Sequence, residues 1–131
     1  MDKCKFRVFD NDDKKMHDVI EIMFREDNTV VEWLNSKHKK RSAFIDEVPV
    51  FQCTGLKDSK GTMIYEGDIV TFEKASNDKL RKGVVKYYKN YCHFYVQVEE
   101  NNWARPFNII PDRQYLEVVG NMYENEELLN G

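Results

Sequence analysis

Apolar and polar residues alternate at every second position in several short runs, and this pattern constrains the fold more than any other feature. In the run 92–98 the even-numbered residues are a cysteine, a phenylalanine and two valines, whereas the odd-numbered residues are His93, Tyr95 and Gln97. A side-chain period of two is typical of a β-strand with one buried face. Similar runs occupy 5–9, 20–24, 31–33, 69–72, 84–88 and 116–123.

Polar turn segments separate these runs. The first three runs are joined by short polar stretches and predict an antiparallel meander, with Ile20, Ile22 and Phe24 on one face. The polar and basic segment 35–42 is expected to be a loop. A fourth strand is predicted over 44–53, where Pro49 indicates an edge position or a break because proline cannot donate a ladder hydrogen bond.

The length and composition predict one compact β-rich unit. The chain has 131 residues, of which 41% are hydrophobic and 13% aromatic, which is enough to bury one core. There is no internal repeat and no long amphipathic helix, so the strand pattern favours a barrel or a sandwich. Asn125 is expected to cap a short helical turn over Glu126–Leu129.

Two stretches carry a resemblance to a known family. The first is Gln52-Cys53-Thr54-Gly55-Leu56-Lys57-Asp58-Ser59-Lys60-Gly61 running into Ile64-Tyr65-Glu66-Gly67-Asp68-Ile69-Val70. The second is Val118-Val119-Gly120-Asn121-Met122-Tyr123-Glu124-Asn125, and the opening Lys5-Phe6-Arg7-Val8-Phe9-Asp10 also fits. Together they resemble the YopX family.

The resemblance implies a mainly β fold: an SH3-like small β-barrel over 65–131, with an N-terminal antiparallel β region, 1–64, packed on it. It also implies a phage or prophage origin, and it implies no chemistry. Gly55, Gly61 and Gly67 of these motifs are expected at tight reversals with positive φ. Asp58 and Asp68 are expected to accept hydrogen bonds from the backbone of their turns.

Charge and cysteine content narrow the functional classes. The formal net charge is −3, which counts against a dedicated nucleic-acid binder, although a local basic patch is compatible with it. Cys4, Cys53 and Cys92 have no short spacing and form a poor disulfide framework. No apolar run reaches the length of a membrane span, so we expect a cytoplasmic protein of a bacterial host cell with reduced thiols.

No pattern of catalytic or metal-binding residues stands out. The cysteines and histidines lack paired zinc-ligand spacing, and adjacent Cys92 and His93 are expected on opposite faces of one strand, with Cys92 in the core. There is no nucleophile elbow, phosphate-binding glycine loop or dinucleotide fingerprint. We therefore predict no enzymatic activity and expect no catalytic, metal-binding or cofactor-binding residues and no cofactor.

Basic and aromatic residues supply the predicted binding surface. One group is the basic run containing Lys37, Lys39, Lys40 and Arg41, and a second is the lysine- and tyrosine-rich strand region. Trp103 and Arg105 between two turns are a third. The predicted binding residues are Lys37, Lys39, Lys40, Arg41, Lys86, Tyr87, Tyr88, Tyr95, Trp103 and Arg105.

Three functional classes remain open at this point. A non-enzymatic accessory or regulatory protein that binds a protein partner, or a second copy of itself, ranks first because aromatic and arginine residues dominate interface energetics. A small β-barrel that binds nucleic acid through stacked tyrosines and flanking lysines ranks second. An enzyme of unrecognised type ranks last.

Overall fold

The computed structural model describes residues 5–72, 81–90, 92–98, 103–106 and 116–129, with only the backbone described for 103–106. The chain divides into two compact units, 1–52 and 53–131. The boundary therefore lies earlier than the predicted division at 64/65. The reason is that Ile64 packs in the core of the second unit, and its strand pairs with a strand that begins at Cys53.

The N-terminal unit is one antiparallel sheet. Its strands are β1 (Arg7–Asp10), β2 (Lys15–Phe24), β3 (Thr29–Leu34), β4 (Lys40–Phe44) and β5 (Val50–Phe51), in the order β4-β3-β2-β1-β5. The predicted meander is confirmed, because β1, β2 and β3 are neighbours with antiparallel pairing. The predicted strand over 44–53 is not continuous, because 45–48 form a turn, and Pro49 directly precedes the short edge strand β5.

A bulge in β2 changes which residues face the core of this unit. The core cluster contains Val8, Val19, Val31 and Trp33. The register of β2 against β3 shifts between Val19 and Glu21, so Val19 is buried while Ile20 is 52% exposed. The prediction that 20, 22 and 24 share one face was therefore wrong, because one extra residue in a strand inverts the alternation that follows it.

The basic segment 35–42 is partly strand, and its prediction as a loop was wrong for its second half. Only 35–39 form a turn, in which the Asn35 side-chain oxygen accepts hydrogen bonds from the backbone N–H groups of Lys37 and Lys39 at 2.9 Å each. His38 takes a left-handed φ of 60°. The following residues pair with β3, since tertiary pairing overrides the weak strand preference of lysine.

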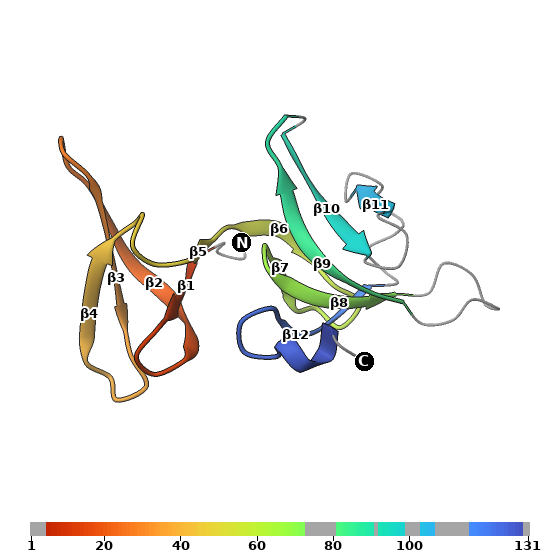
Figure 1. The fold of residues 1–131 in the computed structure, drawn as a ribbon, viewed down its shortest axis with the longest axis horizontal. Helices are drawn as coiled ribbons and strands as arrows, with labels where there is room; N and C mark the ends of the chain where they lie inside the picture. The colour runs from red at the N-terminus through yellow and green to blue at the C-terminus, as the bar shows by residue number, and fades with distance from the viewer. Residues whose placement is uncertain (1–4, 73–80, 91, 99–102, 107–115, 130–131) are drawn as a thin grey trace. The chain divides into compact units, whose positions relative to one another are not determined.

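The second unit contains two further sheets (Figure 1). One pairs β6 (Cys53–Lys57) with β7 (Met63–Tyr65), and the other has the order β11-β10-β9-β8-β12. The strands of the larger sheet are β8 (Asp68–Phe72), β9 (Arg81–Tyr88), β10 (His93–Val98), β11 (Trp103–Pro106) and β12 (Leu116–Asn121). Its core cluster contains Ile64, Val70, Phe72, Val85, Val96, Val98 and Leu116.

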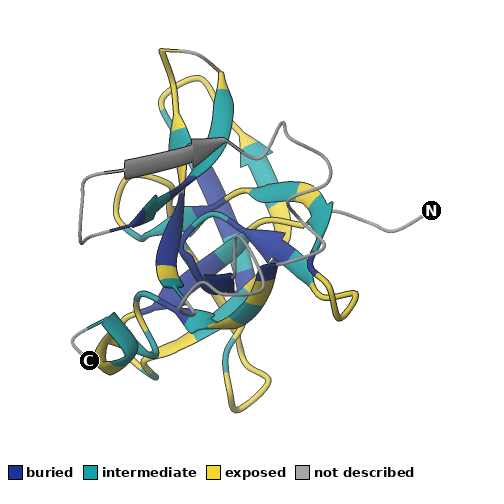
Figure 2. Ribbon diagram, turned by 90° about the vertical axis from the view of Figure 1, so that its right-hand side faces the viewer, coloured by how far each residue is buried: buried dark blue, intermediate teal, exposed yellow. Residues whose placement is uncertain are grey.

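The mainly β prediction is confirmed, but a closed barrel is not observed. In the part of the chain that the structure describes, β11 and β12 lie at opposite edges of the larger sheet without pairing to each other. Buried residues concentrate on the strands and exposed ones at the turns (Figure 2). Among the described residues, no helix has the length and hydropathy that a membrane-spanning helix needs.

The turn chemistry of the second unit follows the sequence motifs. Gly55, Gly61 and Gly67 have φ values of 81°, 83° and 89°, as predicted. Asp58 accepts hydrogen bonds from the N–H groups of Lys60 and Thr62, and its second oxygen accepts one from Val118 in β12 at 2.8 Å. This aspartate therefore ties the glycine-marked turn to a strand far along the chain.

Three local predictions in this unit differ from the structure, at Asn125, Cys92 and Cys53. A short 3-10 helix does occupy Glu126–Leu129, but the Asn125 side chain accepts a hydrogen bond from Asn121 instead of capping it. Cys92 lies in an exposed turn with a φ of 53° before β10, so its predicted core position was wrong. Cys53 is disulfide-bonded, which contradicts the expectation of reduced thiols; pairing depends on proximity in space, which sequence spacing did not reveal.

Candidate functional site

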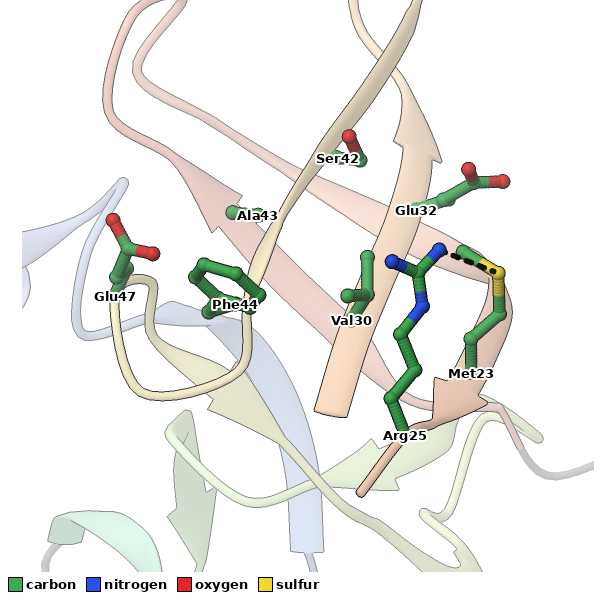
Figure 3. Close-up of a pocket in the computed structure, with 8 residues that line it drawn as sticks. All are labelled: Met23, Arg25, Val30, Glu32, Ser42, Ala43, Phe44 and Glu47. Atoms are coloured by element: carbon green, nitrogen blue, oxygen red, sulfur yellow. Dashed lines mark hydrogen bonds between the residues drawn. The ribbon is translucent and has the colours of Figure 1, made fainter. Parts of the chain in front are cut away.

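A hollow of about 420 Å³ lies on the solvent side of the N-terminal sheet, over β2, β3 and β4 (Figure 3). Its floor is a cross-strand row, because Met23 is opposite Val30 and Val30 is opposite Phe44. Val30 is buried, whereas Phe44 is 41% exposed. A shallow apolar floor of this kind suits an apolar side chain of a partner, because interface energy concentrates where aromatic and apolar groups are desolvated.

Charged groups surround this floor. Arg25, Glu32 and Glu47 line the hollow, and the Arg25 guanidinium points toward the Met23 sulfur at 3.9 Å (Figure 3). Ser42 and Ala43 complete the lining. The residues that line the hollow therefore present both signs of charge and contain no cysteine or histidine.

Glu32 is the least exposed of the three charged residues that line the hollow. Its side chain is only 15% exposed, and it lies opposite Glu21 on β2, which places two carboxylates side by side. The Lys40 ammonium lies 3.6 Å from the Glu32 Oε2 atom, beyond hydrogen-bond distance, and no described residue donates a hydrogen bond to this buried oxygen. A buried acceptor without a donor is unfavourable, and the nearby Lys40 ammonium offsets part of this cost.

A polar network fixes the turns at the other end of the same sheet. The Trp33 indole N–H donates to Asp10 Oδ2 at 2.9 Å, and Asp12 and Asp13 donate their backbone N–H groups to Asp10 Oδ1. Asp13 Oδ2 in turn accepts hydrogen bonds from the Ser36 N–H and hydroxyl. The network therefore joins the β1–β2 turn to the turn that precedes β4.

This network lowers the pKa of both carboxyls. Burial alone would raise the pKa of Asp13, but hydrogen bonds from Ser36, His17 and Lys15 lower it to about 2. Burial would likewise raise the pKa of Asp10, yet the hydrogen bonds from Trp33 and from the turn backbone lower it. Both groups are therefore held as carboxylates.

The same network is the group most like a metal site among the described residues. The potential ligand atoms of Asp10, Asp13 and His17 all lie within 4.8 Å of one another. However, their carboxylate oxygens already accept the hydrogen bonds given above, and His17 Nε2 lies 2.7 Å from Asp13 Oδ2. The arrangement is explained by turn formation. Sequence analysis missed it, although two aspartates in a polar turn followed by a histidine at 17 are a visible signal.

The predicted basic residues of the N-terminal unit lie on the turn and on β4. Lys37 and Lys39 are exposed on the turn, with no ion pair to any described residue. Lys40 lies beside Glu32, and Arg41 pairs with Asp12. Two of these four predicted cations are therefore partly neutralised within the unit, and the cations of the turn remain available.

The predicted lysine and tyrosines of the second unit divide between two faces of β9 and β10. Tyr88 makes edge-on ring contacts with His93 and Tyr95, with centroid distances of 6.0 and 5.9 Å, and Lys86 is paired in register with Tyr95. Tyr87 instead packs on Phe94 on the core side. The structure thus keeps Lys86, Tyr88 and Tyr95 together and removes Tyr87 from that face.

Two remaining predicted residues have only a backbone position. Trp103 and Arg105 belong to β11, where Trp103 pairs in register with Val98 and Arg105 with Val96. Their side chains lie outside the described part of the structure. The basic turn and the tyrosine face belong to different units.

The hydrogen bond that Cys92 makes with Tyr87 raises the pKa of that tyrosine.

The fold and the surface define a small all-β protein built from two units of antiparallel sheet. The family described as YopX protein matches residues 5–130. The chain therefore belongs to the YopX family, as the sequence motifs predicted.

Two solved structures share this fold. Protein EF1440 from Enterococcus faecalis is 24% identical, with a TM-score of 0.63, over 97% of this chain and 98% of that one. Protein yopX from Bacillus subtilis is 19% identical, with a TM-score of 0.66, over 98% and 99% of the two chains. No curated protein matches the sequence significantly. These likenesses show the fold and no activity.

Proposed function

We propose that this YopX-family protein is a non-enzymatic accessory or regulatory protein that acts by binding another protein. The observation that supports this proposal is the hollow over β2, β3 and β4, with an apolar row on its floor and charged side chains around it. A partner that inserts an apolar side chain and carries charged groups beside it would match both features.

The composition of the hollow favours binding over catalysis. Catalytic sites bring a nucleophile or base together with groups that stabilise developing charge. The hollow offers two carboxylates, one guanidinium and one hydroxyl around an apolar floor. We therefore propose no enzymatic role. From the family resemblance we also propose a phage or prophage origin, with action in the cytoplasm of a bacterial host.

A crosslinking experiment with a matched control tests the proposed binding. A photoactivatable residue would replace Phe44 in the hollow in one variant and Phe24, which is 85% exposed, in the other. We expect a discrete protein adduct in host cells from position 44 only. With the identified partner, Phe44→Ser should weaken binding about 30-fold and Phe24→Ser should leave it unchanged. Equal adducts from both positions would contradict the proposal.

Nucleic-acid binding is the second candidate, and the outer face of β9 and β10 favours it. Lys86, Tyr88, His93 and Tyr95 place rings and a cation together, and single-stranded nucleic acid binds proteins by stacking on rings beside cations. Tyr88→Ala should weaken binding of a single-stranded oligonucleotide about tenfold at low salt. Absence of any binding at low salt would remove this candidate.

We also propose that the second unit is an SH3-like barrel. The support for this proposal is the five-stranded antiparallel order of the larger sheet and the bulge of β12 between Val118 and Gly120, since bulges provide the curvature that closure needs. An experimental structure in which β11 and β12 remain far from closure would count against it.

A further inference from the structure

We infer that β4 is an open docking edge that accepts an extended segment of a partner protein as an added antiparallel strand. This inference rests on the proposed binding function and specifies its mode. In the described part of the sheet, β4 pairs with β3 only and forms the end of the order β4-β3-β2-β1-β5. An edge strand presents unpaired backbone groups that a peptide can pair with.

The hydrogen-bond pattern shows which residues of β4 face outward. Ile45 donates its N–H to the Thr29 carbonyl, and Lys39 accepts from Asn35, so the odd-numbered positions around β4 bond toward β3. In an antiparallel pair the positions between these bonds direct their N–H and C=O groups the other way. Lys40 and Ser42 therefore offer their N–H and C=O groups to an added strand, and Phe44 offers its N–H, because its carbonyl accepts a hydrogen bond from the Glu47 N–H at 2.9 Å.

The side chains of these same residues lie beside the hollow. Phe44 and Ser42 line it, and Lys40 reaches the Glu32 carboxylate that forms part of its wall. Side chains at alternate positions of an added strand share one face. A partner strand would thus gain main-chain hydrogen bonds from the edge and could place an apolar side chain next to Phe44.

The charges along the edge specify the chemistry of the added strand. The end of β4 near the turn carries Lys37, Lys39 and Lys40, whereas the Phe44 end has the apolar floor of the hollow. The complementary strand has acidic residues at one end and apolar residues at the other. For antiparallel addition the apolar residues lie in its N-terminal half and the acidic residues in its C-terminal half.

A second copy of this chain fits the edge less well. Pairing two β4 edges around Ser42 would place the cationic end of one copy against the apolar end of the other. The Phe44 ring of each copy would then lie opposite Lys40 of the other copy and would gain no apolar side chain. We therefore assign the edge to a strand of a different protein, and a dimer that forms through β4 would overturn this assignment.

The probe for this inference is a short blocked peptide that reads valine and threonine first and glutamate and threonine last. Its control has the same composition in reversed order. We expect the first peptide to bind about fivefold more tightly than the control, an effect of the size given by a few surface charges. Amide hydrogen exchange should slow at Lys40, Ser42 and Phe44. Equal binding, or exchange that does not slow at these amides, would overturn the inference.

Two protein variants test how much the lysine charge beside β4 contributes to binding of the probe. Lys39→Glu should weaken binding of the probe about fivefold, while Lys60→Glu, an equal charge change on an exposed turn of the other unit, should leave it unchanged. Equal weakening by both variants would contradict a local docking site and indicate a general charge effect.

A third comparison tests the backbone hydrogen bonds, first by changing the probe and then by changing the protein. N-methylation of the probe at the amides that face β4 should weaken binding at least about fivefold, whereas methylation of the amides that face away should not. Ser42→Pro, with Ser42→Thr as control, removes the outward N–H from the protein side. If the Phe44 crosslink forms while the probe gives no protection of β4, the added strand is excluded and the proposed binding function stands.

Discussion

The two units are both antiparallel sheets, yet different interactions hold them together. Among the described residues, the core cluster of the second unit has seven buried members, whereas that of the N-terminal unit has four. In the N-terminal unit Asp10 and Asp13 bind the side chains of Trp33 and Ser36, whereas Asp58 of the second unit accepts from backbone N–H groups. Hydrogen bonds at the turns thus complement a smaller apolar core.

This difference is consistent with our proposal that the binding surface lies on the N-terminal sheet. A network at the turns fixes the positions of β3 and β4 without covering the opposite face of the sheet or its edge. Phe44 can therefore lie in an open hollow while Trp33 packs on the other side.

The largest expected effect tests the core of the second unit. Phe72→Ala should lower the free energy of unfolding of that unit by about 4 kcal/mol, because it removes a fully buried ring and leaves a cavity. Amide hydrogen exchange at Val85 would measure the change. Phe44→Ala on the exposed face is the matched control and should cost less than about 0.5 kcal/mol. Similar losses from the two variants would remove the contrast between core and surface.

The next effect concerns a close approach of β9 to β10. A Cβ atom at Gly83 would lie 2.4 Å from Val96 Cγ1 and 2.8 Å from the Gln97 carbonyl oxygen. Gly83→Ala should therefore destabilise the second unit by about 3 kcal/mol, as overpacked cores do. Thermal unfolding would measure it. Gly61→Ala meets no atom within 4 Å and costs only the strain of a positive φ, about 1 kcal/mol. A larger loss at Gly61 would show that backbone strain dominates.

The third prediction tests the turn network by pH. The pKa of Asp13 is about 2 in the folded state against 3.8 ordinarily, so this carboxylate stabilises the fold above about pH 4. The stabilisation, roughly 2 kcal/mol, should disappear as the pH falls from about 4 to 2. Hydrogen exchange at Val31 would follow the N-terminal unit. Asp13→Asn should flatten this dependence, and an unchanged acid transition would show that Asp13 does not cause it.

The smallest effect tests the buried bond of the same network. Trp33→Phe keeps an aromatic side chain, although a smaller one, and removes the donor to Asp10. Loss of this bond should cost the N-terminal unit about 1.5 kcal/mol. Urea denaturation would measure this loss. Adding Asp10→Asn to that variant should cost less than it does in the native background, because the two residues share one bond. Additive losses would mean that the bond contributes little.

Much of the fold follows from the sequence alone. Period-two runs predicted most of the strands because side chains alternate across any strand, and the glycines of the family motifs predicted three reversals because only glycine adopts positive φ without strain. Asp58 and its turn were predicted for the same local reason. The motifs also identified the family.

Tertiary structure alone decided the site. The bulge in β2, the strand character of Lys40 and Arg41, and the exposed place of Cys92 depend on pairing with distant segments, which local pattern does not encode. The row from Met23 to Phe44 joins three strands, so no sequence window contains it. Local rules act within a few residues, whereas a binding surface forms where strand pairing brings distant side chains together.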